Sequence, residues 1–382
     1  MRARTVVVHR PIGPRTAFSA RRAHQRGAAI VTALFVVTLA AILVASVLWR
    51  QQVQVRRIEN QRLLAQAQWV SRGALDWTRL ILRAEADTSP TVTYLGGVWA
   101  VPIAKTRLSD FLGKIGVAQA GQGEDTFVSG SIEDAQGKFN LRNLVSVPAP
   151  GQLQINIQQT LVFQRLLQSF GFSGQQLARK TALYVRASLK QSATRFQTPN
   201  NPLTGNAGNA QPQQLGGAVG GNNFTSKPGL EDTDDDSADV PLQMTSVDSL
   251  LNVPGFTPEI VERLRPFVTV LPTQTPVNMN TAPAEVVAAI TPGMTVSTAQ
   301  AFVSRRQTVF FRNTSDVTLA LRGAGAPPQA EDANSVPIDV TTSYFFVHGR
   351  VQHRRAEVDR TTLVYRDPLT HSTRIVRVED AP

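Results

Sequence analysis

The sequence predicts an α+β protein that begins with one long helix. An uncharged apolar run covers residues 28–49, and helical periodicity continues beyond it to about residue 86. Strand-like alternation appears at residues 126–133 and again at residues 344–378. A mainly helical sequence separates these two strand regions. We therefore expect an antiparallel sheet that carries a large inserted helical domain.

The apolar run predicts a membrane-spanning helix. Its sequence, AAIVTALFVVTLAAILVASVLW, contains no charged residue and no proline. At about 1.5 Å per residue it forms a helix of roughly 33 Å, which is enough to cross a hydrocarbon core of about 30 Å. An ordinary secretory signal has a shorter apolar core. The run is therefore expected to be a single-pass anchor.

The positive charge of the chain is concentrated ahead of this anchor. The net charge is +11, and residues 1–27 contain seven arginines and no acidic residue, which leaves four net charges for the rest. Basic residues beside a spanning helix stay on the cytoplasmic side. We expect a cytoplasmic leader at residues 1–27 and a folded part across the membrane. The absence of cysteine suits both oxidising and reducing compartments.

Residues 50–141 are expected to hold the rest of the long helix and the first strands. Apolar and charged residues interleave up to about residue 86, and no proline occurs before Pro90, so one helix of about 55 to 60 residues is predicted. Residues 92–104 and 126–133 have strand-like composition. The residues Asp-Ala-Gln-Gly at 134–137 predict a turn, after which Phe139 and Leu141 are expected to face the long helix.

Residues 142–335 are expected to form the inserted helical domain. Two helical patterns lie within residues 158–190, and Gly171 to Ser173 separate them. The polar tract at residues 191–230 has too few apolar residues to form a core, and we expect it to be disordered. Residues 336–382 then supply three strands, with a turn at Asp367-Pro368, that complete the sheet.

An acidic cluster follows the polar tract. Carboxylates at alternate positions can supply the oxygen ligands of Ca²⁺, but the glycine and the final glutamate of an EF-hand loop are missing. A solvated acidic loop is the alternative interpretation. The cluster consists of Glu231, Asp232, Asp234, Asp235, Asp236 and Asp239.

Two tight turns are predicted in the insert, at Pro254-Gly255 and at Pro292-Gly293. A helix follows each turn, with Thr257 as the cap of the first one. Two such units resemble tandem helix-hairpin-helix folds, which in DNA-binding proteins hold phosphate through backbone N–H groups. A membrane-anchored, competence-type DNA-binding protein is therefore the alternative function.

The charges near these turns argue against nucleic acid as a partner. Glu259 and Glu262 follow the first turn, no lysine follows the second, and no basic patch with interleaved aromatic residues is present. An enzyme is not predicted either, because no nucleophile with a base, metal-ligand spacing or phosphate loop is found. Of the histidines in the last strands, His348 and His353 are five residues apart and face opposite sides of a strand.

Three blocks of sequence resemble the minor pseudopilin K family of type II secretion systems. They are RGAAIVTALFVVTLAAILVASVLWRQQVQVRRIENQRLLAQAQW, SIEDAQGKFNLRNL and LLNVPGFTPEIVERLRPFVTVLPTQTPVNMNTAPAEV. The resemblance covers most of the chain outside the leader and the polar tract. It implies a pilin-like sheet and cleavage by prepilin peptidase between Gly27 and Ala28, with methylation of the new amino terminus. It also implies calcium near the acidic cluster, although the usual upstream ligands are not visible in YVRASLK.

The fifth residue after this cleavage is Thr32. Most pilins and pseudopilins have glutamate there, and this sequence is similar to the K family in lacking it. A carboxylate inside a bilayer is costly unless it is paired, and a subunit at the tip of a fibre has no neighbour above it to pair with. Thr32 therefore fits a tip position. The alternative is a hydroxyl that bonds back to its own helix.

The resemblance implies a structural function without catalysis. We expect a minor pseudopilin at the tip of the type II secretion pseudopilus, anchored in the bacterial inner membrane with its carboxy-terminal part in the periplasm. The implied partners are the minor pseudopilins I and J, other pseudopilins, prepilin peptidase and secreted exoproteins. Its expected roles are initiation of the pseudopilus and export of folded proteins across the outer membrane.

Overall fold

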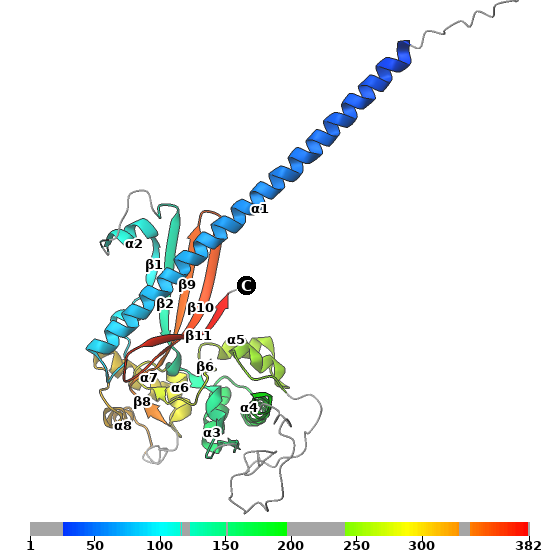
Figure 1. Cartoon of the computed structure of the whole chain (residues 1–382). Helices are drawn as coiled ribbons and strands as arrows, with labels where there is room; N and C mark the ends of the chain where they lie inside the picture. The colour runs from blue at the N-terminus through cyan, green and yellow to red at the C-terminus, as the bar shows by residue number, and fades with distance from the viewer. Residues whose placement is uncertain are drawn as a thin grey trace, which may run out of the picture. The chain divides into compact units, whose positions relative to one another are not determined.

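The computed structural model describes residues 26–114, 116, 123–149, 152–196, 241–327 and 337–380. The chain divides into two compact units, residues 1–62 and residues 63–382. Figure 1 shows the elements of both units. The mixed fold class predicted from the sequence is confirmed, with a long amino-terminal helix and an antiparallel sheet.

The first element is α1, which runs from Arg26 to Thr88 and contains 63 residues. It is slightly longer than predicted, and its extent agrees with the absence of proline from this stretch. Residues 29–62 are exposed throughout, whereas the part from Leu63 onward alternates between buried and exposed positions. Among the described residues, α1 is the one helix long and apolar enough to cross a membrane.

A five-stranded antiparallel sheet forms the first part of the second unit. Its order is β1-β2-β9-β10-β11. β2 pairs with β9 from Thr126 opposite His353 to Asp134 opposite Phe345, although more than 200 residues separate the two strands in the sequence. The carboxy-terminal strands therefore complete a sheet that β1 and β2 begin. The strands are β1 (Ile103–Arg107), β2 (Thr126–Asp134), β9 (Tyr344–His353), β10 (Ala356–Arg366) and β11 (Thr373–Asp380).

The carboxy-terminal part of α1 covers one face of this sheet (Figure 1). One core cluster joins Leu82 of α1 to Phe345, Val347 and Val364 of the strands. Trp99 completes this cluster, and its ring meets that of Phe345 edge-on at 5.5 Å between centroids. A second, separate cluster joins Ala67 of α1 to Val128, Val351 and Val358. Burial of these apolar side chains holds the helix against the sheet.

The large insert lies between β2 and β9 and has its own hydrophobic core. The helices α3 and α4 are separated by Gly171, whose φ of 81° is in the region that favours glycine. The α-helices of the insert are α3 (Ile157–Ser169), α4 (Gly174–Phe196), α5 (Pro258–Leu264), α6 (Ala284–Ile290), α7 (Val296–Thr308) and α8 (Thr314–Gly323).

Short elements connect these helices. Three pairs of two-residue strands lie within the described part of the insert. The pair β4–β5 is antiparallel, whereas β3–β6 and β7–β8 are parallel. The strands are β3 (Phe139–Asn140), β4 (Val145–Ser146), β5 (Gln154–Ile155), β6 (Val268–Thr269), β7 (Val277–Asn278) and β8 (Ile338–Asp339). The 3₁₀ helices are η2 (Ala135–Gly137), η3 (Leu141–Leu144) and η4 (Val247–Asn252). Before β2, the chain also forms η1 (Val98–Ala100) and α2 (Leu108–Lys114).

The predicted position of Phe139 and Leu141 is wrong. Both are fully buried, but they belong to the core of the insert and not to the interface with the long helix. Phe139 lies opposite Val268 in a parallel pair of strands and stacks on Phe163 at 5.6 Å. The core of the insert therefore begins directly after β2, several residues before position 142.

The strand predicted at residues 92–104 is also largely wrong. Only its last two residues are in β1, and a 3₁₀ turn occupies Val98–Ala100. Gly96 and Gly97 before the turn and Pro102 after it interrupt strand pairing, because proline has no N–H and glycine favours turns. Before the first predicted hairpin turn, the chain forms the 3₁₀ helix η4.

Candidate functional site

The predicted processing junction lies at the start of α1. The helix begins at Arg26, so Gly27 and Ala28 are helical residues. The Thr32 hydroxyl donates to the carbonyl oxygen of Ala29 at 3.0 Å. This hydrogen bond back to its own helix is the alternative role of Thr32, and it gives the hydroxyl a partner inside an apolar environment.

The spanning segment of α1 presents apolar side chains on every side. Phe35, Leu39 and Leu43 are all about half exposed or more, and the whole stretch from residue 29 to residue 49 is exposed. Its remaining hydroxyls follow Thr32, since Thr38 and Ser46 also donate to carbonyl oxygens three residues earlier. Such a surface is suited to lipid and not to water.

The second unit contains the carboxy-terminal part of α1, which we call the stem (residues 63–88). Its inner face buries Leu63, Ala67 and Leu82, whereas its outer face exposes 68% of Trp69 and 59% of Leu80. These two residues are 11 positions apart, about three helical turns, so they lie on the same side of the helix. Exposed aromatic and aliphatic side chains along one helix face are typical of a protein-binding surface.

Two features near Trp69 add to this outer face. The Arg72 guanidinium lies 5.0 Å from the centre of the Trp69 ring, which orients both side chains. Gly73 lies between Trp69 and Leu80, and a Cβ added to it would meet no atom within 4 Å. The outer face therefore offers a gap between two projecting side chains, into which a residue of another helix can fit.

A buried carboxylate joins the sheet to the insert. Asp134 ends β2 and is 5% exposed. Its Oδ2 accepts hydrogen bonds from Asn278 Nδ2 at 2.8 Å and from the hydroxyls of Thr281 and Thr342, both at 2.6 Å. Its Oδ1 accepts from the Gln136 N–H at 2.8 Å. Burial raises the pKa of Asp134 above its ordinary value, and these four donors act against that rise.

Two buried arginines lie near this carboxylate. Arg366 of β10 donates to the carbonyl oxygens of Leu82 at 3.1 Å and Thr342 at 3.0 Å. It therefore links the stem to the segment that leads from the insert into β9. Arg306 of α7 donates to the carbonyl oxygen of Met279 at 2.8 Å. Burial lowers the pKa of Arg306 to about 10 and also lowers that of Arg366, while Asp134 opposes both shifts.

Sequence reasoning missed this polar junction. Asp134 was interpreted only as part of a turn, because a charged residue beside glycine usually lies at the surface. A local signal is the row of uncharged residues that follows it, Ala135, Gln136 and Gly137, all of which are buried. Nothing in the sequence indicates its partners in the insert, which lie more than 140 residues away.

The two predicted hairpin turns are present and are covered by this chain. Gly255 has a φ of 105° and Gly293 a φ of 76°, as turns with glycine require. A Cβ on Gly255 would lie 3.0 Å from Leu177, and one on Gly293 would lie 2.9 Å from Pro327. The turns of Pro254-Gly255 and Pro292-Gly293 therefore pack against protein, whereas phosphate binding needs turns that are open to a ligand.

The residues proposed as calcium ligands, Glu231, Asp232, Asp234, Asp235 and Asp236, lie outside the described residues. Within the described ranges no group of three or more histidine or acidic side chains could hold a metal ion. The histidines have separate partners. His348 contacts Glu133 and Thr361, His353 contacts Thr126 and Gln66, and His371 contacts Asp87.

A helix suited to a membrane, continued by a stem on an antiparallel sheet, defines a membrane-anchored subunit of pilin-like architecture. Two sequence profiles, both described as Type II secretion system (T2SS), protein K, match residues 137–273 and 277–341, together more than half of the chain. The chain belongs to the type II secretion system protein K family.

Relatives and a solved structure agree with this assignment. The chain is 27% identical over 338 residues to the Type II secretion system protein K of Pseudomonas aeruginosa, covering 86% of this chain and 85% of that one. It is 24% identical over 355 residues to that of Pectobacterium carotovorum subsp. carotovorum, covering 90% and 93%.

The fold is similar to that of a chain in the crystal structure of the GspK-GspI-GspJ complex from the enterotoxigenic Escherichia coli Type 2 Secretion System. The TM-score is 0.60 at 14% sequence identity, with coverage of 85% of this chain and 99% of that one.

Proposed function

We propose that this chain acts as a minor pseudopilin, a non-enzymatic structural subunit at the tip of the type II secretion pseudopilus. The observation that carries the proposal is α1. One uninterrupted helix holds both a lipid-compatible segment and, within the second unit, a stem whose outer face exposes Trp69 and Leu80. Such a helix serves to pack lengthwise against equivalent helices, and the chain belongs to a family of secretion-system components.

The partners we propose are the pseudopilins I and J. The similar solved chain belongs to a complex described by the names GspK, GspI and GspJ. In this chain the outer face of the stem would be the contact surface, because Trp69 and Leu80 are largely exposed there. Its apolar side chains would be buried against the stem helices of the partners, which removes exposed hydrophobic surface from water.

We propose a tip position on two grounds. Thr32 provides no carboxylate for the amino terminus of a neighbouring subunit, and its hydroxyl is bonded within its own helix. The insert, which follows β2 and returns at β9, adds bulk that would prevent another subunit from stacking above it. The polar junction at Asp134 would keep this insert fixed to the sheet.

We propose that prepilin peptidase removes residues 1–27 and that Ala28 becomes the amino terminus. The seven arginines before the span would keep that end in the cytoplasm, with the sheet and insert in the periplasm. In this arrangement the protein would support initiation of the pseudopilus and export of folded proteins. Calcium binding by the acidic cluster at residues 231–236 remains part of the proposal.

Purification of the complex tests this function. The full chain, co-expressed with pseudopilins I and J of the same organism, is expected to co-purify with both in mild detergent. Trp69→Ala, on the outer face, should weaken that recovery. A matched control is Phe163→Leu, which changes the core of the insert and leaves the stem surface intact. Failure of the unaltered chain to bind either partner would contradict the proposal.

A further inference from the structure

Two glycines face each other in the middle of the sheet. Gly130 of β2 is paired with Gly349 of β9, and the pairs on either side, Val128 with Val351 and Ile132 with Val347, have apolar side chains. Because side chains alternate along a strand, all three pairs face the stem. The two valine-containing pairs belong to separate core clusters. The glycine pair therefore leaves the sheet face without side chains between the two clusters.

The two glycine positions differ in what they allow. A Cβ on Gly130 would lie 2.5 Å from the backbone oxygen of His348, so close packing of the strands accounts for this glycine. A Cβ on Gly349 would meet no atom within 4 Å. The space above Gly349 is therefore empty, although an apolar residue there would normally fill the core of a sheet.

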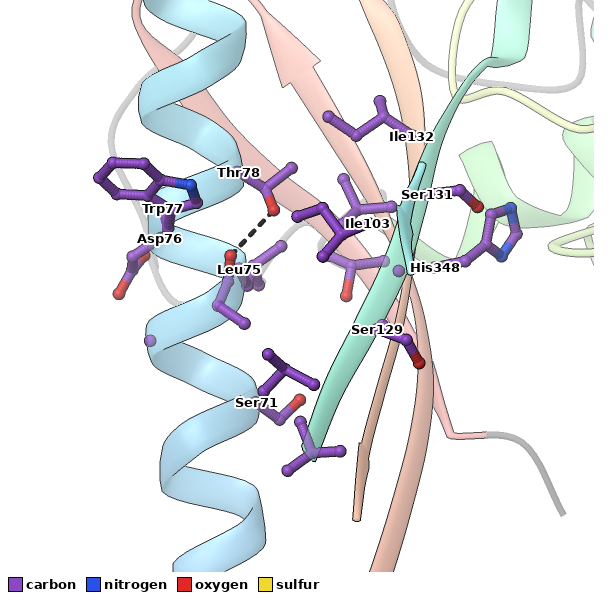
Figure 2. Close-up of a pocket in the computed structure, with 18 of the residues that line it drawn as sticks. Ser71, Leu75, Asp76, Trp77, Thr78, Ile103, Ser129, Ser131, Ile132 and His348 are labelled. Carbon is purple, nitrogen blue, oxygen red and sulfur yellow. Dashed lines mark hydrogen bonds between the residues drawn. The ribbon is translucent and has the colours of Figure 1, made fainter. Parts of the chain in front are cut away.

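The stem does not fill the gap either. Its residues at the cavity include the small Ser71, Ala74 and Thr78, and the cavity between α1 and the sheet has a volume of about 860 Å³. Figure 2 shows Leu75 and Thr78 of α1 on one side of this cavity and Ile103 and Ile132 of the sheet on the other. This volume lies in the range of about 300 to 1,000 Å³ that is typical of small-molecule sites.

The cavity wall is mainly apolar, although hydroxyl groups and the residues Arg72, Asp76, His348 and Arg360 also border it. Ser71 is 7% exposed and Thr362 is 2% exposed, and neither side chain makes a hydrogen bond within the described ranges. The Thr78 hydroxyl, in contrast, donates to the Ala74 carbonyl oxygen at 2.8 Å. A buried atom at this wall that lacks a hydrogen-bond partner among the described residues is Trp99 Nε1, and buried donors normally have partners because an unsatisfied one is costly. Figure 2 shows the Ser71 hydroxyl directed toward the sheet, into the cavity.

The cavity extends across the sheet. Its lining includes Val98 and Val101, which lie just before β1, and Ile375 and Val378 of β11. The strands β1 and β11 are the two edges of the sheet. All four side chains are at least 44% exposed, so apolar groups mark both ends. Strands lie about 4.8 Å apart, which makes the cavity about 19 Å long.

An extended peptide would place unpaired backbone N–H and C=O groups against apolar walls, at a high desolvation cost. A single hydrocarbon chain has no such polar groups. We propose that the cavity is a binding site for a monoacyl amphiphile such as a fatty acid, whose tail lies between the stem and the sheet.

The polar end of such a ligand would lie near β10. Thr362 and Arg360 are on the same face of that strand and both border the cavity. The Arg360 guanidinium forms an ion pair with Asp380 through Nε. The Thr362 and Ser71 hydroxyls would donate to a carboxyl or ester oxygen, and the tail would extend toward Trp99 and Ile103. This site rests on the cavity alone and does not depend on the proposed role in secretion.

Photocrosslinking tests the proposal. The full chain, reconstituted in lipid nanodiscs, is incubated with diazirine-labelled palmitate, irradiated and mapped by mass spectrometry. We expect saturable labelling of stem and sheet peptides around Leu75 and Ile132, displaced by unlabelled palmitate. Gly349→Leu, which fills the empty space, should abolish this labelling. Ser71→Ala combined with Thr362→Val should weaken it about tenfold, as the loss of two hydrogen bonds predicts.

Controls separate a blocked site from a misfolded protein. Trp69→Ala lies on the outer face of the same helix and should leave the labelling unchanged. Circular dichroism and the thermal midpoint of Gly349→Leu should remain near those of the unaltered chain, and the double hydroxyl variant provides a second test if they do not. Labelling confined to residues 28–49, or equal labelling of all variants, would overturn the proposal.

Discussion

The spanning segment and the stem are parts of one helix, yet their side chains have different surroundings. Between residues 29 and 62 every position is exposed, whereas the stem buries Leu63, Ala67 and Leu82 against the sheet. Both parts are rich in apolar residues. The difference shows that hydrophobicity alone does not reveal whether a helix face contacts lipid, the protein's own core or another subunit.

The largest difference between the two parts should appear when a leucine is shortened to alanine. Leu82→Ala removes a fully buried side chain of the stem and should lower the free energy of unfolding by about 2 to 5 kcal/mol. Leu39→Ala in the spanning segment should leave it unchanged, because no protein atoms pack there. Chemical denaturation in detergent measures both, and equal effects would contradict the division into lipid-facing and core-facing segments.

An introduced charge should have its larger effect in the spanning segment and its smaller effect in the stem. Leu39→Asp places a carboxylate near the middle of the span and should make membrane insertion less favourable by about 3 kcal/mol. Leu80→Asp on the outer face of the stem should not affect insertion, since that side chain is 59% exposed within the second unit. Carbonate extraction of membranes compares the two variants. Loss of membrane retention in Leu80→Asp would show that the anchor extends into the stem.

The polar junction predicts how stability depends on pH in the second unit. Because burial raises the pKa of Asp134, the folded state holds that proton more tightly than the unfolded chain does. Its contribution is therefore complete below the ordinary pKa of 3.8 and is lost as the pH rises through the folded pKa. The slope cannot exceed about 1.4 kcal/mol per pH unit for one proton. Asp134→Asn should remove this slope in denaturation curves.

The neighbouring Glu133 should behave in the opposite way. Burial acts to raise the pKa of Glu133, but its contacts with His348 and Lys138 together lower it. Its contribution is present above the ordinary pKa of 4.5 and is lost as the pH falls through the folded pKa. Glu133→Gln therefore serves as the control for Asp134→Asn. A variant of Asp134 with an unaltered pH profile would indicate that its proton affinity does not change on folding.

The smallest effect is expected for Trp69→Ala. This side chain is 68% exposed, so its loss should leave the thermal midpoint nearly unchanged. Association with the I and J partners should weaken by about 1 kcal/mol, roughly fivefold, because a large aromatic contact is lost. Interferometry on the detergent-solubilised complex measures this change. A large drop in the thermal midpoint would place Trp69 in the core of the protein and not at an interface.

Much of the fold follows from local sequence, and the errors come from long-range contacts. The absence of proline between Arg26 and Thr88 predicts α1, and the alternation in β9 and β10 predicts strands. The burial of Phe139 was also predictable, because it is an apolar residue next to a turn. Its position opposite Val268 was not, since that pairing spans about 130 residues.

The functional features were likewise predictable only where they depend on local sequence. The spanning segment and the two hairpin glycines are evident in the sequence, because composition and turn chemistry are local properties. Asp134 and the glycine pair were not recognised. Their environment depends on the register of β2 against β9, which places Gly130 opposite Gly349, and on threonines supplied by distant loops.

The amino terminus of the mature protein tests the central claim most directly. A pseudopilin is processed at the junction of leader and anchor, so mass spectrometry of the protein extracted from bacterial membranes should identify Ala28 as the first residue. Residues 1–27 should be absent, and expression without prepilin peptidase should retain them. A mature protein that begins at any other residue would contradict the assignment of this helix as a pseudopilin anchor.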